Sequence, residues 1–311
     1  MSFWIPHIDG VPVRKLADER KMSPAQTYKK IISEMDLLPD NTWLTAKYCN
    51  RFCGILIVDG KYVKVKGYKE KIPFIFCLDY LTHDPIVGIL APSKNEEAFL
   101  KLFKLLKTCN YPLQIVVCDD RSSLIPALKY HYPKAHIQLC QNHYVENIRQ
   151  QLHIRTSKYH AHFFHSLCLR VFKEYANDRQ LNDALHHLLT KRTENDPLRQ
   201  MIVMDIHRRR KELFAYTKIP HCPQNTNLIE LYNSHLNGRL KTIKGFKSFH
   251  AALRWLNAYL IRRRTKPFTD CKMKFKQLNG KTSMEMTLKK QAEWPEIFGL
   301  KMPDYQPKTE R

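Results

Sequence analysis

Three carboxylates have the residue type and the positions for chemistry in this chain: Asp59, Asp119 and Glu230. Asp59 follows the apolar run ILIV, Asp119 follows the apolar run IVVC, and Glu230 lies inside a helical pattern. Acidic side chains are rarely buried without a partner, and a metal ion is the usual partner where several converge. Because the surrounding chain is strongly basic, such a cluster indicates metal-dependent chemistry on a phosphate backbone.

Carboxylates of this kind can hold a pair of Mg²⁺ or Mn²⁺ ions. One ion activates a water or a 3′-hydroxyl, and the other stabilises the leaving oxygen in an in-line displacement. The sequence contains no Ser/His/Asp or GxxxxGK[ST] signature that would indicate other chemistry. We therefore expect Asp59, Asp119 and Glu230 to be both catalytic residues and metal ligands, with two ions per site. Asp120 competes with Asp119, but alternation turns the two to opposite faces, and we favour Asp119 because it directly follows the buried run.

The net charge of +23, from 52 Lys and Arg against 29 Asp and Glu, favours a polyanionic partner. Nucleic acid is the leading candidate, and an anionic membrane surface is a distant second. No stretch reaches the roughly 18–20 apolar residues of a membrane helix, so we expect no membrane association. The N-terminus lacks the pattern of a signal peptide, and the nine scattered cysteines are typical of reduced thiols in an intracellular protein.

The order of elements predicts an α/β fold. Apolar runs at 53–67, 72–82 and 85–93 predict three antiparallel strands, the first of them possibly kinked at Gly60. A helix, a buried strand at 113–119, a short helix and a fifth strand at 135–140 follow. The series βββαβαβ indicates a mixed sheet with helices packed on it. In such a sheet the strands that carry Asp59 and Asp119 are neighbours.

The N-terminal segment contains two short helical patterns with a tight break between them. Ser23 is a good N-cap with Pro24 at the first helical position, and Tyr28, Ile31 and Ile32 give the second helix an apolar face. We interpret the pair as a helix-turn-helix that binds DNA, although an ordinary helical hairpin is the alternative. Residues 38–52 are predicted to be a linker.

These patterns divide the chain into five parts. We expect a helix-turn-helix and linker at 1–45, the first part of a catalytic core at 46–147 and an all-helical insertion at 148–221. The last part of the core, with the helix of Glu230, is expected at 222–265, and a basic, loosely packed tail at 266–311.

Two weaker patterns are ambiguous by themselves. Asn227, Glu230 and Asn233 recur at i, i+3 and i+6 and form a polar stripe, which alone would be typical of a solvated helix face. Cys140 and His143 form a C-x2-H element just after the fifth strand, and one Cys/His pair is not a zinc site without further ligands. It could instead orient the site or contact DNA. Trp255 is expected in the core, and the other histidines are expected at the surface or in satisfied interior positions.

Taken together, VDGKYVKVKG, VVCDDRSSLIPAL, HIQLCQNHYVENI and TNLIELYNSHLNGRLKTIKGF resemble the mutator-type bacterial insertion-sequence transposases, over roughly residues 50–265. The resemblance implies a ribonuclease H-like fold with a helical insertion, and it places Asp59, Asp119 and Glu230 at the family's Asp-Asp-Glu triad. Cys140 and His143 match the family's C-x2-H element. Some relatives begin with a Cys-rich zinc-binding module, and the residues before Trp4 contain no such module. We therefore expect either a shorter variant or an incomplete copy.

The resemblance also implies partners. We expect a prokaryotic, cytoplasmic, nucleoid-associated transposase that binds terminal inverted repeats and target DNA as a homo-oligomer. The rivals are a ribonuclease H-like structure-specific nuclease and a domesticated or inactive DNA-binding regulator. The candidate DNA contacts are polar or basic residues of the helical segments: Gln26, Thr27, Lys29, Lys30, Arg208, Arg209, Arg210, Asn227, Asn233, Arg239, Lys241, Lys244, Arg262 and Arg263.

Overall fold

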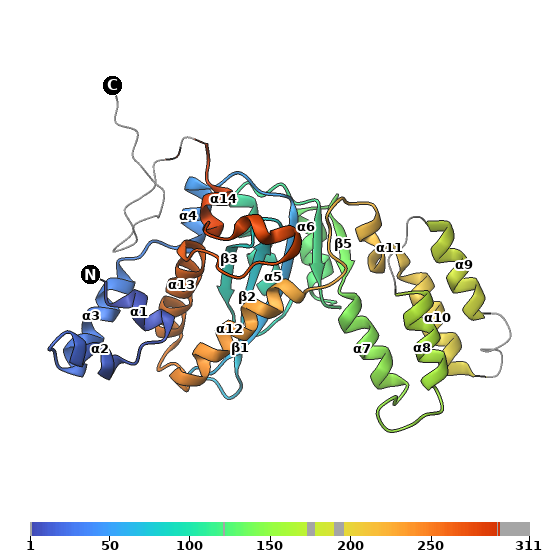
Figure 1. The fold of residues 1–311 in the computed structure, drawn as a ribbon, viewed down its shortest axis with the longest axis horizontal. Coiled ribbons are helices and arrows are strands. Elements are labelled where there is room, and N and C mark those ends of the chain that lie inside the picture. Colours follow the sequence, from blue (N-terminus) through green and yellow to red (C-terminus); the bar gives the residue numbers. More distant parts are fainter. Residues whose placement is uncertain (1, 121, 173–177, 190–195, 291, 293–311) are drawn as a thin grey trace. The chain divides into compact units, whose positions relative to one another are not determined.

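The computed structural model describes residues 2–120, 122–172, 178–189, 196–290 and 292 (Figure 1). The chain divides into two compact units. Unit 1 is Met1–Pro112, Ser123–Pro133 and Leu228–Arg311, and unit 2 is Leu113–Ser122 and Lys134–Asn227. No helix in the described part of the chain is long and apolar enough to cross a membrane.

Unit 1 is built on the antiparallel strands β1 (Ile55–Val63), β2 (Ile72–Asp79) and β3 (Asp84–Leu90). Every residue of β2 is buried, as its continuous apolar run predicts for a strand covered on both faces. β1 runs unbroken through Gly60, where a Cβ would lie 3.0 Å from the carbonyl oxygen of Phe74. The first apolar run is therefore a single strand, and glycine permits the close approach of its neighbour.

The helices of unit 1 cover this sheet with apolar faces. Phe99, Leu102, Phe103 and Leu106 of α5 (Glu96–Thr108) are buried at helical spacing, and α5 packs on β3. Three longer helices also follow the first strand: α6 (Leu124–His131), α12 (Asn227–Ile243) and α13 (Phe249–Thr265). As expected, Trp255 of α13 is a core residue, and its ring is stacked on that of Tyr259.

The first three helices of the chain are α1 (Trp4–Asp9), α2 (Val13–Glu19) and α3 (Pro24–Asp36). The predicted start of α3 is confirmed, because Ser23 and Gln26 form a reciprocal capping box before the helix. No local pattern indicates α1, whose Trp4 side chain is fully buried. Its first backbone N–H groups donate to the carboxylate of Glu34 in α3, so a tertiary contact caps this short helix.

The buried face of α3 differs from the expected one. Thr27, Ile31 and Met35 are buried at i, i+4 and i+8, whereas Tyr28 is 45% exposed. The expectation that Thr27 stays available for DNA was therefore wrong. Threonine is small enough to lie against the neighbouring helices, and the tyrosine ring can keep its polar end in water.

Two segments expected to be loose are ordered. Residues 38–52 contain α4 (Asn41–Tyr48), which packs on β3 and α13, so the prediction of a linker was wrong. The described start of the basic tail contains the short 3₁₀ helix η2 (Met273–Leu278) and α14 (Ser283–Thr287). α14 packs on β3 and α13, so the prediction of a loose tail was also wrong for this part. Both segments lack strong apolar periodicity because they are held largely by polar contacts. Residues 293–311 lie outside the described part.

A buried ion pair supplies the centre of those polar contacts. Arg264 of α13 and Asp84 of β3 are both fully buried and are joined by bonds of 2.9 and 2.7 Å. Arg264 also donates to Thr45 of α4, at 2.7 Å, and Asp84 accepts from Thr287 of α14, also at 2.7 Å. Four elements that are distant in sequence therefore depend on one pair of charges.

Unit 2 contains the parallel strands β4 (Ile115–Cys118) and β5 (His136–Leu139). Its other described elements are helical, as predicted for the insertion: α7 (Gln141–Gln151), α8 (Ala161–Arg170), α9 (Asp178–Leu189), α10 (Pro197–Arg208), α11 (Arg210–Leu213) and the 3₁₀ helix η1 (Ala215–Thr217). The buried side chain of Gln138 joins the end of β5 to this region, because its amide donates to the carbonyl of Leu213 and accepts from the N–H of Tyr216.

The five strands form one mixed sheet in the order β3-β2-β1-β4-β5. The chain is thus an α/β protein with the element series βββαβαβ, as its sequence predicts.

We predict that Arg264→Met lowers the free energy of unfolding by about 3–5 kcal/mol, because it leaves the carboxylate of Asp84 buried without its counter-charge. Equilibrium denaturation would measure the loss. Arg208→Met is the matched control, since it removes a 78%-exposed partner of Asp205 and should cost about 0–1 kcal/mol. Equal losses in the two variants would contradict the importance of the buried pair.

We also predict that His83 makes the stability depend on pH. Burial, aided by the charge of Lys274, lowers the pKa of His83 from 6.5 to about 4. Between pH 6.5 and pH 4, His83 is protonated in the unfolded chain but stays neutral in the folded chain. The free energy of unfolding therefore falls by about 1.4 kcal/mol for each pH unit as the pH drops through that window. His83→Asn, which suits the φ of +57° at this position, should remove this part of the decline. Unfolding measured at pH 7 and pH 4.5 would test it, and an unchanged difference between the two pH values would contradict it.

Candidate functional site

Asp59 lies in the middle of β1 and is paired with residues of unit 1 from two other elements. Its side chain is 16% exposed. One carboxylate oxygen accepts from the ammonium of Lys94 at 3.0 Å, and the other accepts from the amide of Asn233 at 2.8 Å. Lys94 is only 7% exposed and lies just before Asn95, which caps α5. A half-buried carboxylate therefore faces a cation and the helix that carries Glu230.

α12 is docked by one side. Ile229, Tyr232 and Leu236 are buried, and the Tyr232 hydroxyl donates to the carbonyl of His83 at 2.6 Å. Glu230 is exposed, and it shares a helix face with Asn233, three residues later. The polar stripe is thus not a fully solvated face, because its last member, Asn233, is buried against Asp59.

Asp119 follows β4 directly and belongs to a polar cluster in unit 2. One of its carboxylate oxygens lies 2.7 Å from Nδ1 of His143. The hydrogen bonds from His143 to Asp119 and Cys140 raise the pKa of the histidine to about 11. Burial opposes ionisation of the Cys140 thiol, but hydrogen bonds from His143 and Thr226 lower its pKa on balance. The C-x2-H element is therefore part of a hydrogen-bonded group that includes the second acid.

The same group is the one candidate metal cluster of three His, Cys, Asp or Glu residues within the described ranges. The potential ligand atoms of Asp119, Cys140 and His143 lie within 4.8 Å of one another. The sequence indicates no further ligand near the Cys/His pair, because Asp119 lies close to the pair only in the folded chain. The other histidines belong to no such group in the described part.

Asp120 has a different partner from Asp119. The guanidinium of Arg209 binds both of its carboxylate oxygens, and one of these bonds is 2.7 Å long. The two adjacent acids thus point to separate surroundings, as alternation predicts. The assignment of the catalytic role to Asp119 stays a prediction.

Sequence reasoning missed two residues of these clusters. Lys94 sits in a polar turn and carried no motif, so nothing in the sequence singled it out. Thr226 immediately precedes α12 and is fully buried, with its hydroxyl 3.2 Å from the sulfur of Cys140. A threonine directly before a helix is expected to be a capping residue, so the sequence did not indicate that Thr226 also contacts the C-x2-H element.

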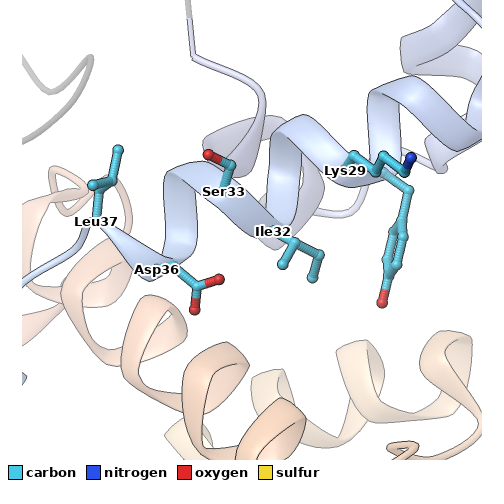
Figure 2. A pocket seen from close by; sticks show the side chains of 6 residues that line it. Lys29, Ile32, Ser33, Asp36 and Leu37 are labelled. Carbon is cyan, nitrogen blue, oxygen red and sulfur yellow. The ribbon is translucent and has the colours of Figure 1, made fainter.

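One of the candidate DNA contacts on α3, Lys29, lines a shallow surface depression of unit 1. Figure 2 shows Ile32 and Asp36 among the side chains that line it. Its lining residues are Tyr28, Lys29, Ile32, Ser33, Asp36 and Leu37. Lys29 and Lys30 are exposed, and Gln26 is exposed although its side chain is engaged in the capping box. Of the four candidates on this helix, only Thr27 is buried.

The remaining candidates fall into an exposed and an engaged group. Arg208, Arg210, Lys241, Lys244 and Asn227 are exposed. Three of these exposed side chains still have partners, since Arg208 pairs with Asp205, Arg210 donates to Asn182 and Asn227 accepts from Asn142. The others make intramolecular contacts: Arg209 with Asp120, Asn233 with Asp59, Arg239 with the carbonyl of Ile8, Arg262 with Asp9, and Arg263 with the ring of Tyr232. These contacts stabilise the fold, so the exposed group is the more accessible to a phosphate backbone.

Among the similarities of this chain to known proteins, one establishes its family. No curated protein matches it. A chain of the Drosophila P element transposase strand transfer complex is similar at a TM-score of 0.44 and 12% identity, over 84% of this chain and 91% of that chain, which is too low a score to establish a shared fold. The family described as "Transposase, Mutator family" matches residues 9–266. That match covers most of the sequence, including all three candidate acids, and the chain therefore belongs to the Mutator family of transposases.

Proposed function

We propose that this transposase cuts phosphodiester bonds at the inverted-repeat ends of its own element and joins the freed 3′-hydroxyl to target DNA. Asp59, Asp119 and Glu230 are the proposed catalytic acids, on a sheet of the ribonuclease H-like kind. The observation that carries the proposal is the 2.8 Å hydrogen bond from Asn233 to Asp59. It connects residues 174 positions apart and brings the helix of the third acid against the strand of the first.

The residues around Asp59 fit a hard divalent cation. Mg²⁺ and Mn²⁺ prefer carboxylate and carbonyl oxygens. Beside the Asp59 carboxylate, the buried Oδ1 atom of Asn233 has no hydrogen-bond partner among the described residues. A buried amide oxygen without a donor is costly unless something else satisfies it.

Each protein group then has a defined task. The two Mg²⁺ or Mn²⁺ ions, when bound, would supply the activation of the attacking oxygen and the stabilisation of the leaving one. Asp59, Asp119 and Glu230 would hold them. Asn233 orients Asp59, and His143 donates to Asp119. Exposed basic side chains, such as Lys241 and Lys244, would neutralise backbone phosphates.

The reaction also implies an assembly and a location. Transposition holds two DNA ends together, so we propose that the chain acts as a dimer or a larger homo-oligomer on DNA. A prokaryotic, nucleoid-associated protein would fit that role and the charge of +23.

We predict that Asp59→Asn, Asp119→Asn and Glu230→Gln each abolish Mg²⁺-dependent cleavage while leaving DNA binding largely intact, because each removes a charged metal ligand and keeps the side-chain shape. The substrate would be a duplex carrying the inverted repeat that brackets the gene. Cleavage would be followed on gels, and binding by mobility shift in Ca²⁺ buffer.

Two variants serve as matched controls for this test. Asp120→Asn changes the neighbouring acid, and Glu70→Gln changes an exposed acid in a turn of unit 1; both should cleave. Cleavage by Asp119→Asn together with its loss in Asp120→Asn would move the second role to Asp120. Normal cleavage by Asp59→Asn or Glu230→Gln would overturn the triad.

A further inference from the structure

The C-x2-H element lies between Asp119 and the start of α12, and it contacts both. Nδ1 of His143 is 2.7 Å from the Asp119 carboxylate. The sulfur of Cys140 accepts from the N–H and the hydroxyl of Thr226, at 3.4 and 3.2 Å. Thr226 is the residue before α12, and Glu230 follows one turn into that helix. All these contacts lie within unit 2.

Further hydrogen bonds attach the same two segments to each other. The N–H of Gln141 donates to the carbonyl of Gln224 at 2.9 Å, and Asn142 donates to the side chain of Asn227 at 2.9 Å. Every residue from 140 to 143 thus contacts either Asp119 or the segment 224–227. The start of α7 is itself anchored, because the buried amide of Gln141 donates to the carbonyl of Leu213 at 2.9 Å.

We propose that Cys140 and His143 are positioning residues, which hold the carboxylate of Asp119 in a fixed orientation beside the segment 224–227. This inference rests on the proposed function of the triad. His143 orients the Asp119 carboxylate, because its Nδ1 lies 2.7 Å from one of the two oxygens. Cys140, buried and bonded to Thr226, prevents the start of α12 from shifting relative to Asp119.

The geometry favours this role over a zinc site. Two ligand atoms of one tetrahedral zinc, with bonds of about 2.0–2.1 Å, would lie about 3.3 Å apart. The His143 nitrogen and the Asp119 oxygen are 2.7 Å apart, which is the length of a charge-assisted hydrogen bond. The hydroxyl of Thr226 also occupies the neighbourhood of the Cys140 sulfur. These atoms bond to one another, as outer partners of a ligand do.

The test compares His143→Leu, which removes the donor, with His143→Asn, which keeps a donor near the place of Nδ1. Mn²⁺ binding to the full-length protein would be measured by electron paramagnetic resonance, and cleavage of the inverted-repeat duplex would be titrated with Mg²⁺. Loss of an outer partner typically weakens metal affinity about 10–100-fold. We expect a weakening of that size in His143→Leu, partial recovery in His143→Asn and a smaller loss in Thr226→Val.

His207→Leu and Thr156→Val, which change exposed residues of the same unit, are the matched controls and should behave like the parent protein. Unchanged Mn²⁺ affinity and Mg²⁺ dependence in His143→Leu, with Asp119→Asn inactive, would overturn the positioning role and leave the triad standing. Activity in Asp119→Asn would instead overturn the assignment of the second acid, on which this inference rests. One zinc per chain in the purified protein, lost in both Cys140→Ser and His143→Leu, would replace the positioning role by a structural metal site.

Discussion

A carboxylate that leaves water must be given a partner, and this constraint governs both the stability and the site of the protein. Asp84 is fully buried and meets it with the guanidinium of Arg264. Asp79 is also fully buried, and its partners are neutral donors, including the hydroxyls of Thr82 and Tyr111. Because a buried charge without a partner costs several kcal/mol, the elements that supply these donors are bound to their places. β3, α4, α13 and α14 are held together in this way.

The proposed catalytic acids meet the same constraint differently. Asp59 and Asp119 remain 16% and 18% exposed, and each is held by a group that carries or can carry positive charge, Lys94 and His143. Glu230 is exposed at the start of a docked helix. Such side chains are oriented but not sealed, so water, ions and phosphate can still reach them. The distinction between sealed and accessible carboxylates separates the structural acids from the candidate catalytic ones.

Much of the fold followed from local pattern. Continuous apolar runs specified the five strands, and the capping box with Pro24 specified where α3 begins. The patterns failed where tertiary contacts replaced periodicity. α1 is capped by Glu34 from another helix, α4 is held by polar contacts to Arg264, and the buried face of α3 is shifted by one residue towards Thr27. In each case the stabilising partner is too distant in sequence for a local pattern to indicate it.

For the site, the sequence by itself supplied the three candidate acids and the C-x2-H element, since residue types in a family's order are local information. The apolar runs alone do not separate Asp59 and Asp119 from Asp79 and Asp84, which also border apolar strands. Only the tertiary structure showed which acids are sealed by partners, that Asn233 reaches Asp59, and that Thr226 joins Cys140. The reason is physical: the surroundings of a carboxylate are set by side chains that arrive from other elements, and their arrival depends on how the whole chain packs.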